Sequence, residues 1–121
     1  MKIAILQVDT AWADRDANFA QLTPLVETAV DHVASLVLLT EMFSTGFVVD
    51  QSDIGEPEGG VSSQFLTQMA TQHKIWIGGS CPEVTKDDPR PFNSFVLVSP
   101  LGEQHRYHKI HPFTFGGEDT Y

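Results

Sequence analysis

Cysteine and basic residues are both scarce in this sequence. Cys81 is the only cysteine among 121 residues, so the chain cannot form an internal disulfide, and a reducing cytoplasm is the compartment we expect. Lysine and arginine total 7 against 16 aspartate and glutamate residues, which gives a formal net charge of −9. Nucleic acids and anionic membranes both select for basic surfaces. We therefore expect neither of them as a partner.

Long apolar runs and several common nucleotide-binding and nucleophile motifs are also absent. No apolar stretch approaches the ~20 residues that a transmembrane helix needs. The apolar run at residues 3–8 meets Asp9 too soon for a signal peptide, and it alternates like a strand. The sequence has no phosphate loop, no Gly-x-Gly-x-x-Gly and no Gly-x-Ser-x-Gly. A nucleotide-binding protein and a serine hydrolase therefore have no support.

The sequence does contain enough apolar residues for one modest domain, at 41% apolar and 19% charged. Residues 3–8 predict a strand that is apolar on both faces, as in the centre of a sheet. Residues 36–40 predict a second, buried strand. Between them, after Asp14 or Asp16 as a cap, apolar residues recur at the spacing of a buried helical face. This order predicts a βαβ unit with parallel strands.

The rest of the chain predicts one more helix and three more strands. Pro24 lies inside the first helical pattern and should kink or restart that helix, because its nitrogen cannot donate. A polar loop at residues 48–60 is placed to form one wall of a pocket, and residues 61–73 predict a second helix. Strands are predicted at residues 75–81, 92–98 and 103–110. Their connectors show no helical pattern, so we expect these strands to be antiparallel and the fold to be α/β.

Glu41 directly follows the second predicted strand and precedes a turn of small residues, Ser44, Thr45 and Gly46. In α/β sheets, ligand sites gather just beyond the carboxyl ends of the strands. A carboxylate placed there can be partly desolvated, which raises its pKa and suits it to proton transfer near neutral pH. The alternative is an ordinary surface glutamate in a loop, and the local sequence leaves both open.

Lys109 ends the last predicted strand, beside aromatic residues and a proline. In a restricted pocket its ammonium could donate to a developing oxyanion, whereas the alternative is a solvated lysine. His105, His108 and His111 suggest a metal site, but alternation along a strand turns His108 away from the other two. Histidines at a strand edge are the simpler interpretation. Cys81 is either a nucleophile or, more simply, a small buried apolar residue.

Three segments together resemble the nitrilase superfamily of carbon–nitrogen hydrolases. They are the first strand up to Asp9, the apolar strand that ends in Glu41, and the run YHKIHPF at residues 107–113. The stretch EMFSTGF at residues 41–47 is most similar to the amidase branch that includes ω-amidases. The resemblance implies that Glu41 is the general base and that Lys109 stabilises the oxyanion. It also implies that Glu118 supports the lysine and the substrate.

The resemblance implies a fold as well. The superfamily has an α-β-β-α sandwich, and residues 1–121 would be the N-terminal part of that single domain, a mixed sheet with two helices on one face. The superfamily's nucleophilic cysteine lies on a later strand, after the lysine, whereas Cys81 precedes Lys109. The chain therefore looks like the N-terminal half of the enzyme without its nucleophile. Thr40 stands where the superfamily usually has proline, at a position that shapes the turn rather than reacts.

The activity that the resemblance implies is hydrolysis of a small amide to an acid and ammonia by a Glu-Lys-Cys mechanism, with no cofactor and no metal. The expected partner is the small amide substrate. Half of a sandwich leaves one face of its sheet uncovered, so we also expect a homo-oligomer. The alternative is a non-catalytic half-domain that acts only through assembly or binding.

Overall fold

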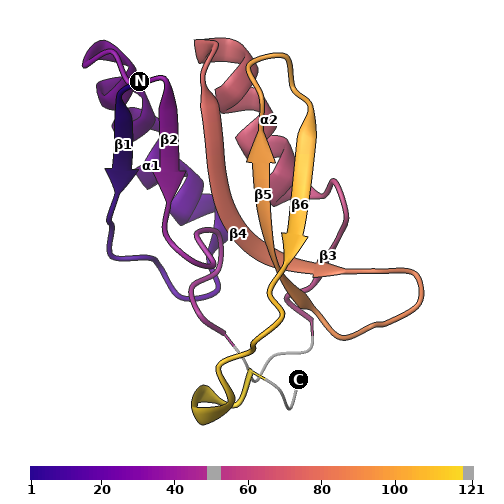
Figure 1. Cartoon of the computed structure of the whole chain (residues 1–121). Coiled ribbons are helices and arrows are strands. Elements are labelled where there is room, and N and C mark those ends of the chain that lie inside the picture. Colours follow the sequence, from indigo (N-terminus) through magenta and orange to yellow (C-terminus); the bar gives the residue numbers. More distant parts are fainter. Residues whose placement is uncertain (49–52, 119–121) are drawn as a thin grey trace.

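The computed structural model describes residues 1–48 and 53–118. The elements in chain order are β1 (Ile3–Leu6), α1 (Arg15–Asp31), β2 (Leu36–Leu39), β3 (Glu56–Pro57), α2 (Val61–His73), β4 (Trp76–Val84), β5 (Phe92–Val98), β6 (Gln104–His108) and the short 3-10 helix η1 (Thr114–Gly116). The strands form one mixed sheet in the order β1-β2-β4-β5-β6, with β3 beside β4, and both α-helices cover the same face (Figure 1). Within the described residues, no helix combines the length and the apolar character of a membrane span. This arrangement confirms the predicted α/β class.

The first half of the chain forms the predicted βαβ unit, with β1 and β2 parallel. Asp14 caps α1, because its carboxylate accepts a hydrogen bond of 3.0 Å from the backbone N–H three residues later. Of the two predicted effects of Pro24, a kink or a restart, the restart does not occur, because α1 runs continuously through this residue. A proline in a helix interior costs ~3 kcal/mol, because it lacks an N–H and crowds the preceding turn. The buried face of α1 offsets this cost by packing Leu22, Val26 and Ala29 into the core.

The second half of the sheet is antiparallel, as predicted, but two of its strand ends differ from the prediction. β4 continues through Pro82, beyond the predicted end at residue 81. β2 accompanies β4 only as far as Gly78, so the missing N–H of Pro82 lies where β4 has lost that neighbour. β6 ends at His108 rather than at residue 110. Lys109 adds one more bond, from its N–H to the Asn93 carbonyl (2.9 Å).

Two further features of the sheet correct the sequence-based expectation. β3 lies inside the segment that was predicted to be a loop, and it pairs with the end of β4; residues 49–52 of that segment lie outside the described residues. β1 is an edge strand of the described sheet rather than a central one. One of its apolar faces, Ala4 and Leu6, packs against the core. The other face, Ile3 and Ile5, is exposed.

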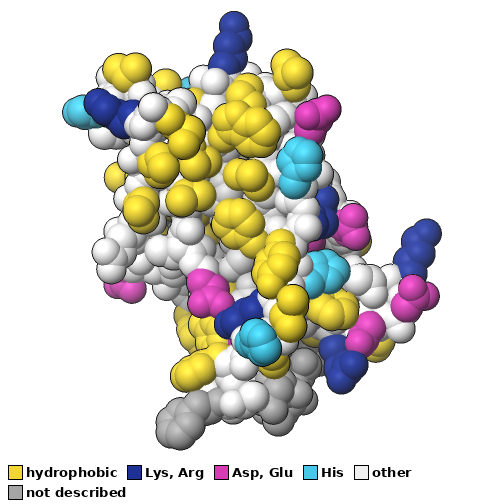
Figure 2. Space-filling model, in the orientation of Figure 1, with side chains coloured by type: hydrophobic (Ala, Val, Ile, Leu, Met, Phe, Trp, Pro, Cys, Tyr) yellow, Lys and Arg dark blue, Asp and Glu magenta, His cyan; other side chains and the backbone are white. Residues whose placement is uncertain are grey.

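The sheet therefore has one covered face and one open face. The core lies between the sheet and the helices, and it contains the fully buried side chains of Leu66 and Ile77. On the opposite side, the register places Ile3 beside Leu36 and Leu36 beside Trp76. We call this side the open face; its apolar members are Ile3, Ile5, Leu36, Leu38, Trp76, Phe95, Leu97 and Tyr107. Figure 2 shows hydrophobic side chains gathered over the strands on this face.

Candidate active site

Glu41 lies in a turn that starts just after β2 and is bonded to β4. The next residue, Met42, has a positive φ of 53°, which is uncommon for a residue other than glycine. Its backbone N–H donates to the Ser80 hydroxyl (2.8 Å), and the Phe43 N–H donates to the Ser80 carbonyl (3.0 Å). The side chain of Phe43 is also fully buried. The backbone from which Glu41 projects is therefore fixed by both hydrogen bonds and packing.

A buried amide holds the other side of this turn. Asn18 on α1 donates to the Ser44 carbonyl (2.9 Å) and to the Ala11 carbonyl (2.8 Å), and it accepts from the Ala11 N–H (2.7 Å). The Ala13 N–H donates to the Thr45 carbonyl (2.7 Å). Asn18 is almost completely buried, so its bonds satisfy backbone groups that solvent does not reach. The turn after β2 is thus held between α1 and β4.

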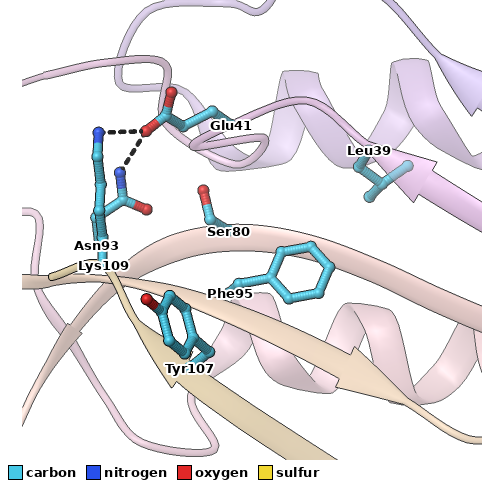
Figure 3. Close-up of a pocket in the computed structure, with 7 residues that line it drawn as sticks. All are labelled: Leu39, Glu41, Ser80, Asn93, Phe95, Tyr107 and Lys109. Carbon is cyan, nitrogen blue, oxygen red and sulfur yellow. Dashed lines mark hydrogen bonds and ion pairs between the residues drawn. The ribbon is translucent and has the colours of Figure 1, made fainter. Parts of the chain in front are cut away.

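Lys109 follows β6, and its ammonium lies between two carboxylates. The Nζ atom is 2.9 Å from Glu41 Oε1 and 2.9 Å from Glu118 Oε2. Glu41 and Lys109 are separated by 68 positions in the sequence, and Figure 3 shows the two side chains meeting. The Phe47 ring lies 5.6 Å from Nζ, measured to its centroid. The structure therefore brings together the three side chains that the sequence analysis selected.

Glu118 is held by more bonds than Glu41. Its Oε2 also accepts a hydrogen bond from the Phe113 backbone N–H, and its Oε1 accepts one from Asn93 Nδ2 (3.0 Å). The same Asn93 nitrogen donates to Glu41 Oε1 (2.8 Å). The side chain of Glu118 is 14% exposed, against 53% for Glu41. Glu118 is the anchored carboxylate, and Glu41 is the more accessible one.

The charges in this cluster stabilise one another. Burial disfavours the charged form of Lys109, but its hydrogen bonds and charge contacts with the two carboxylates outweigh burial and raise the pKa of Lys109 above its usual value. Burial also acts to raise the pKa of Glu118. Hydrogen bonds from a backbone N–H, from Lys109 and from Asn93 together outweigh that effect and lower the pKa of Glu118. At neutral pH, Lys109 is therefore protonated and Glu118 is ionised.

Two hollows adjoin the contact between Glu41 and Lys109. One is a cavity of about 280 Å³ with a mixed apolar and polar wall. Figure 3 shows its lining residues, which are Leu39, Glu41, Ser80, Asn93, Phe95, Tyr107 and Lys109. The other, of about 400 Å³, is lined by Glu41, Phe47, Lys109 and Phe113. Both volumes are close to those of small-molecule sites, roughly 300–1,000 Å³. The arrangement offers a carboxylate that can take a proton and an ammonium that can donate to an oxyanion.

Cys81 and the histidines of β6 lie outside this cluster. The Cys81 side chain is completely buried in the core, and burial raises the pKa of its thiol far above the usual value. His105 stacks on Trp76, and His108 stacks on Phe92 from the other face of β6, as the alternation predicts. Among the described residues, no three side chains of His, Cys, Asp or Glu gather so as to hold a metal ion.

The sequence analysis missed Asn93 and Ser80 as members of the site. The feature that would have identified these two residues is the register of the strands that carry them. The last paired residues of β5 and β6 are Ser94 and His108, so the next step places Asn93 beside Lys109. Alternation puts Asn93 on the same side of β5 as the cavity-lining residues. Alternation can be read from one sequence, but the register that aligns two strands cannot.

Comparison with known proteins identifies a family. The sequence model for carbon-nitrogen hydrolases matches residues 2–121. The chain is 33% identical over 118 residues to the omega-amidase YafV of Yersinia enterocolitica, a match that covers 98% of this chain and 44% of that protein. It is 31% identical over 119 residues to a nitrilase of Pyrococcus abyssi, covering 93% and 44%.

The fold comparison agrees with the sequence comparison. A CN-hydrolase superfamily protein of Xanthomonas campestris superposes with a TM-score of 0.89 and 29% identity, over 98% of this chain and 43% of that one. Nit3 of Saccharomyces cerevisiae, a member of the nitrilase superfamily, superposes with a TM-score of 0.81 and 27% identity, over 93% and 45%. The chain thus spans less than half the length of these relatives. It belongs to the carbon–nitrogen hydrolase family.

Proposed function

We propose that this chain contributes the general base and the oxyanion-stabilising cation to an amidase that hydrolyses a small amide to an acid and ammonia. The observation that carries the proposal is the position of the Lys109 ammonium, 2.9 Å from Glu41 and beside a cavity of small-molecule size. The relatives include a protein named as an omega-amidase, which supports an ω-amide as the substrate class.

The thiol nucleophile of this reaction would come from outside these 121 residues. Cys81 does not suit the role, because its side chain is completely buried and its raised pKa keeps the thiol protonated. The chain also spans only 44% of the omega-amidase that it matches. We infer that residues 1–121 correspond to the N-terminal part of the catalytic domain and that the nucleophile belongs to the remainder.

In the first half-reaction, Glu41 takes the thiol proton, and the thiolate attacks the carbonyl carbon of the amide. The electron pair of the C=O bond moves to the oxygen. Lys109 has three N–H donors and uses two on Glu41 and Glu118, so one is left for this oxyanion. The C–N bond then breaks, Glu41 returns its proton to the leaving nitrogen, and ammonia departs from a thioester.

In the second half-reaction, Glu41 takes a proton from water, and the resulting hydroxide attacks the thioester carbon. Lys109 again donates to the oxyanion. The C–S bond breaks, the acid is released, and the proton on Glu41 returns to the thiolate. Glu118 exchanges no proton in either step, because it remains ionised and holds the ammonium in position.

Ammonia release tests the proposal in two proteins. With a succinamate-like ω-amide, the 121-residue chain alone is expected to release none, because it has no accessible thiol. The second protein joins residues 1–121 to the part of the Yersinia enterocolitica omega-amidase that the chain does not match, and it is expected to release ammonia. In this fusion, Lys109→Met should lower kcat about 10²–10³-fold, the usual effect of losing an oxyanion donor. Lys86→Met is the control, because Lys86 is exposed and lines neither of the two hollows beside Glu41.

Two outcomes would contradict the proposal. Ammonia release by the chain alone, abolished by Glu41→Gln, would show that the nucleophile is present within the 121 residues. A folded fusion that keeps its full rate in Lys109→Met would show that the ammonium does not stabilise the oxyanion. A circular dichroism spectrum and a thermal melt establish that each variant is folded before its rate is compared.

The open face favours a second candidate function, assembly without catalysis. Its apolar side chains lie in register across five strands, and Ile5 is 73% exposed. Exposed apolar areas of this kind mark sites of association. We propose that a second copy of the chain covers this face and that the protein acts in the cytoplasm, as its single cysteine suggests.

A further inference from the structure

We propose that Asn93 is a positioning residue that holds Glu41 and Glu118 together through one side-chain amide, and thereby leaves a defined oxygen of Glu41 open for proton transfer. We call the two hydrogen bonds from the Asn93 amide to Glu41 and Glu118 the clamp, and they are read directly from the geometry. Its link to proton transfer rests on the proposed function.

The amide of Asn93 bridges the two carboxylates. Its Nδ2 atom donates to Glu41 Oε1 at 2.8 Å and to Glu118 Oε1 at 3.0 Å. An ionised carboxylate only accepts, and a primary amide has exactly two N–H donors on one nitrogen. Each donor therefore serves one carboxylate, and the amide orientation is fixed. Figure 3 shows the amide nitrogen directed toward Glu41 and the amide oxygen turned away from it.

Asn93 also fixes Lys109 through its backbone. The Asn93 carbonyl accepts the Lys109 N–H at 2.9 Å, so one residue bonds to all three members of the cluster. Asn93 lies on β5, which is paired with β4 and β6, whereas Glu41 lies in the turn after β2 and Glu118 follows η1. The sheet holds the backbone of Asn93, and bonds to β4 hold the turn that carries Glu41, so the Asn93 amide ties Glu118 to two fixed segments.

The bridge treats the two oxygens of Glu41 differently. Oε1 accepts from both Lys109 and Asn93, and no described residue donates to Oε2. A proton that arrived at Oε1 would have to displace one of two donors, whereas Oε2 is open. Asn93 occupies Oε1 and leaves Oε2 open without adding a charge beside Glu41. A lysine or arginine in its place would make Glu41 a weaker base by favouring its ionised form.

A purely structural role for Asn93, such as ending the β5–β6 pairing, would use only its backbone. The two interpretations differ in what the side chain does to the carboxylates. Carboxyl ¹³C chemical shifts, measured by NMR on the 121-residue chain, distinguish the two interpretations. Asn93→Ala keeps the backbone bond to Lys109 and removes the amide, which should raise the titration midpoint of Glu118 by about one pH unit. Gln64→Ala, which removes an exposed amide on α2, should leave the midpoint unchanged.

A second measurement leaves Asn93 in place and covers the case in which Asn93→Ala does not fold. Both side-chain amide protons of Asn93 should resonate downfield of those of Gln64, because both are bonded to carboxylates. Glu41→Gln should move one of them upfield, and Glu118→Gln should move the other. Amide protons that respond to neither substitution, or a Glu118 midpoint that does not change in folded Asn93→Ala, would overturn the inference.

Neither measurement depends on turnover, so the inference and the amidase proposal can fail separately. If the NMR shifts appear and the fusion releases no ammonia, the clamp stands and the assigned reaction is wrong. If the fusion is active and the shifts are absent, the reaction stands and Asn93 has no positioning role. In an active fusion, Asn93→Ala should lower kcat more than it raises KM, because the change affects proton transfer rather than binding.

Discussion

At the scale of single residues, the site depends on one cation shared between two unequal carboxylates. Glu118 is mostly buried and bonded through both oxygens, whereas Glu41 is half exposed and bonded through one. Two carboxylates close together repel each other, and Lys109 removes that repulsion by lying between them. This difference in environment assigns different roles to the two carboxylates. Glu118 holds the Lys109 ammonium in position, and Glu41 can exchange a proton.

The protein should lose stability in acid through Glu118. Its folded pKa lies below the ordinary value of 4.5, so its contacts contribute fully above that value and are lost as the pH falls through the folded pKa. Urea denaturation of the wild type and Glu118→Gln should therefore show a larger difference in unfolding free energy at pH 7 than at pH 3. An equal difference at both pH values would contradict the lowered pKa.

The sequence predicted these residues to different extents. Glu41 and Lys109 lie where strands end, which is where ligand sites gather, and their order along the chain resembles the family. Glu118 was reached through the resemblance alone. Asn93 was missed because its role depends on the pairing of β5 with β6, and one sequence does not display a register.

At the scale of elements, a buried ion pair joins α2, β4 and β6. The guanidinium of Arg106 on β6 is 3.0 Å from the Glu83 carboxylate on β4 and donates to the Ser63 hydroxyl on α2 (2.9 Å). These contacts cross over β5, the strand that carries Asn93. The pair therefore fixes the strands on either side of the residue that we assign to the clamp.

Loss of this pair should destabilise the fold strongly. Arg106→Met would leave the carboxylate of Glu83, whose side chain is 2% exposed, without a cation. Breaking a buried pair from one side costs about 3–5 kcal/mol. The matched control is Arg90→Met, which breaks an exposed pair with Asp88 and should lower the unfolding free energy far less, because solvent screens exposed charges. Urea denaturation measures both, and equal losses in the two variants would contradict the structural role of Arg106.

Most elements could be predicted from periodicity, and the exceptions share a physical cause. The helices and the order of parallel and antiparallel strands follow from local patterns of apolar residues. β3 has only two residues, too few for any pattern. β1 was predicted to be central because both its faces are apolar, yet Ile3 and Ile5 lie on the open face of an edge strand. Apolar residues on both faces of a strand predict a strand that is covered on both faces, but they do not say whether residues 1–121 supply the second cover.

At the scale of the whole molecule, the open face and the net charge have opposite effects on the association of two copies of the chain. Burial of apolar side chains favours association of two copies, at about 25 cal/mol per Å² of buried apolar surface. A net charge of −9 on each copy opposes it, and salt screens that repulsion.

Association through the open face should therefore strengthen as salt is added. Ile5→Lys places a charge on the open face at the more exposed isoleucine of β1 and should shift the chain toward the monomer. Leu101→Lys is the control, because Leu101 is also apolar and exposed but lies in the turn between β5 and β6. Sedimentation velocity measures the oligomer. A monomeric wild type at all salt concentrations, or equal effects of both substitutions, would rule out this interface.

The most direct test of the amidase assignment is the rate of ammonia release by the fusion protein with and without Glu41. Glu41→Gln keeps the size and the polarity of the side chain and removes its ability to take a proton. The general-base role predicts a fall in kcat of about 10²–10⁴-fold, with Glu27→Gln on the exposed face of α1 as the control. A folded Glu41→Gln fusion that releases ammonia at the rate of the unsubstituted fusion would contradict the assignment.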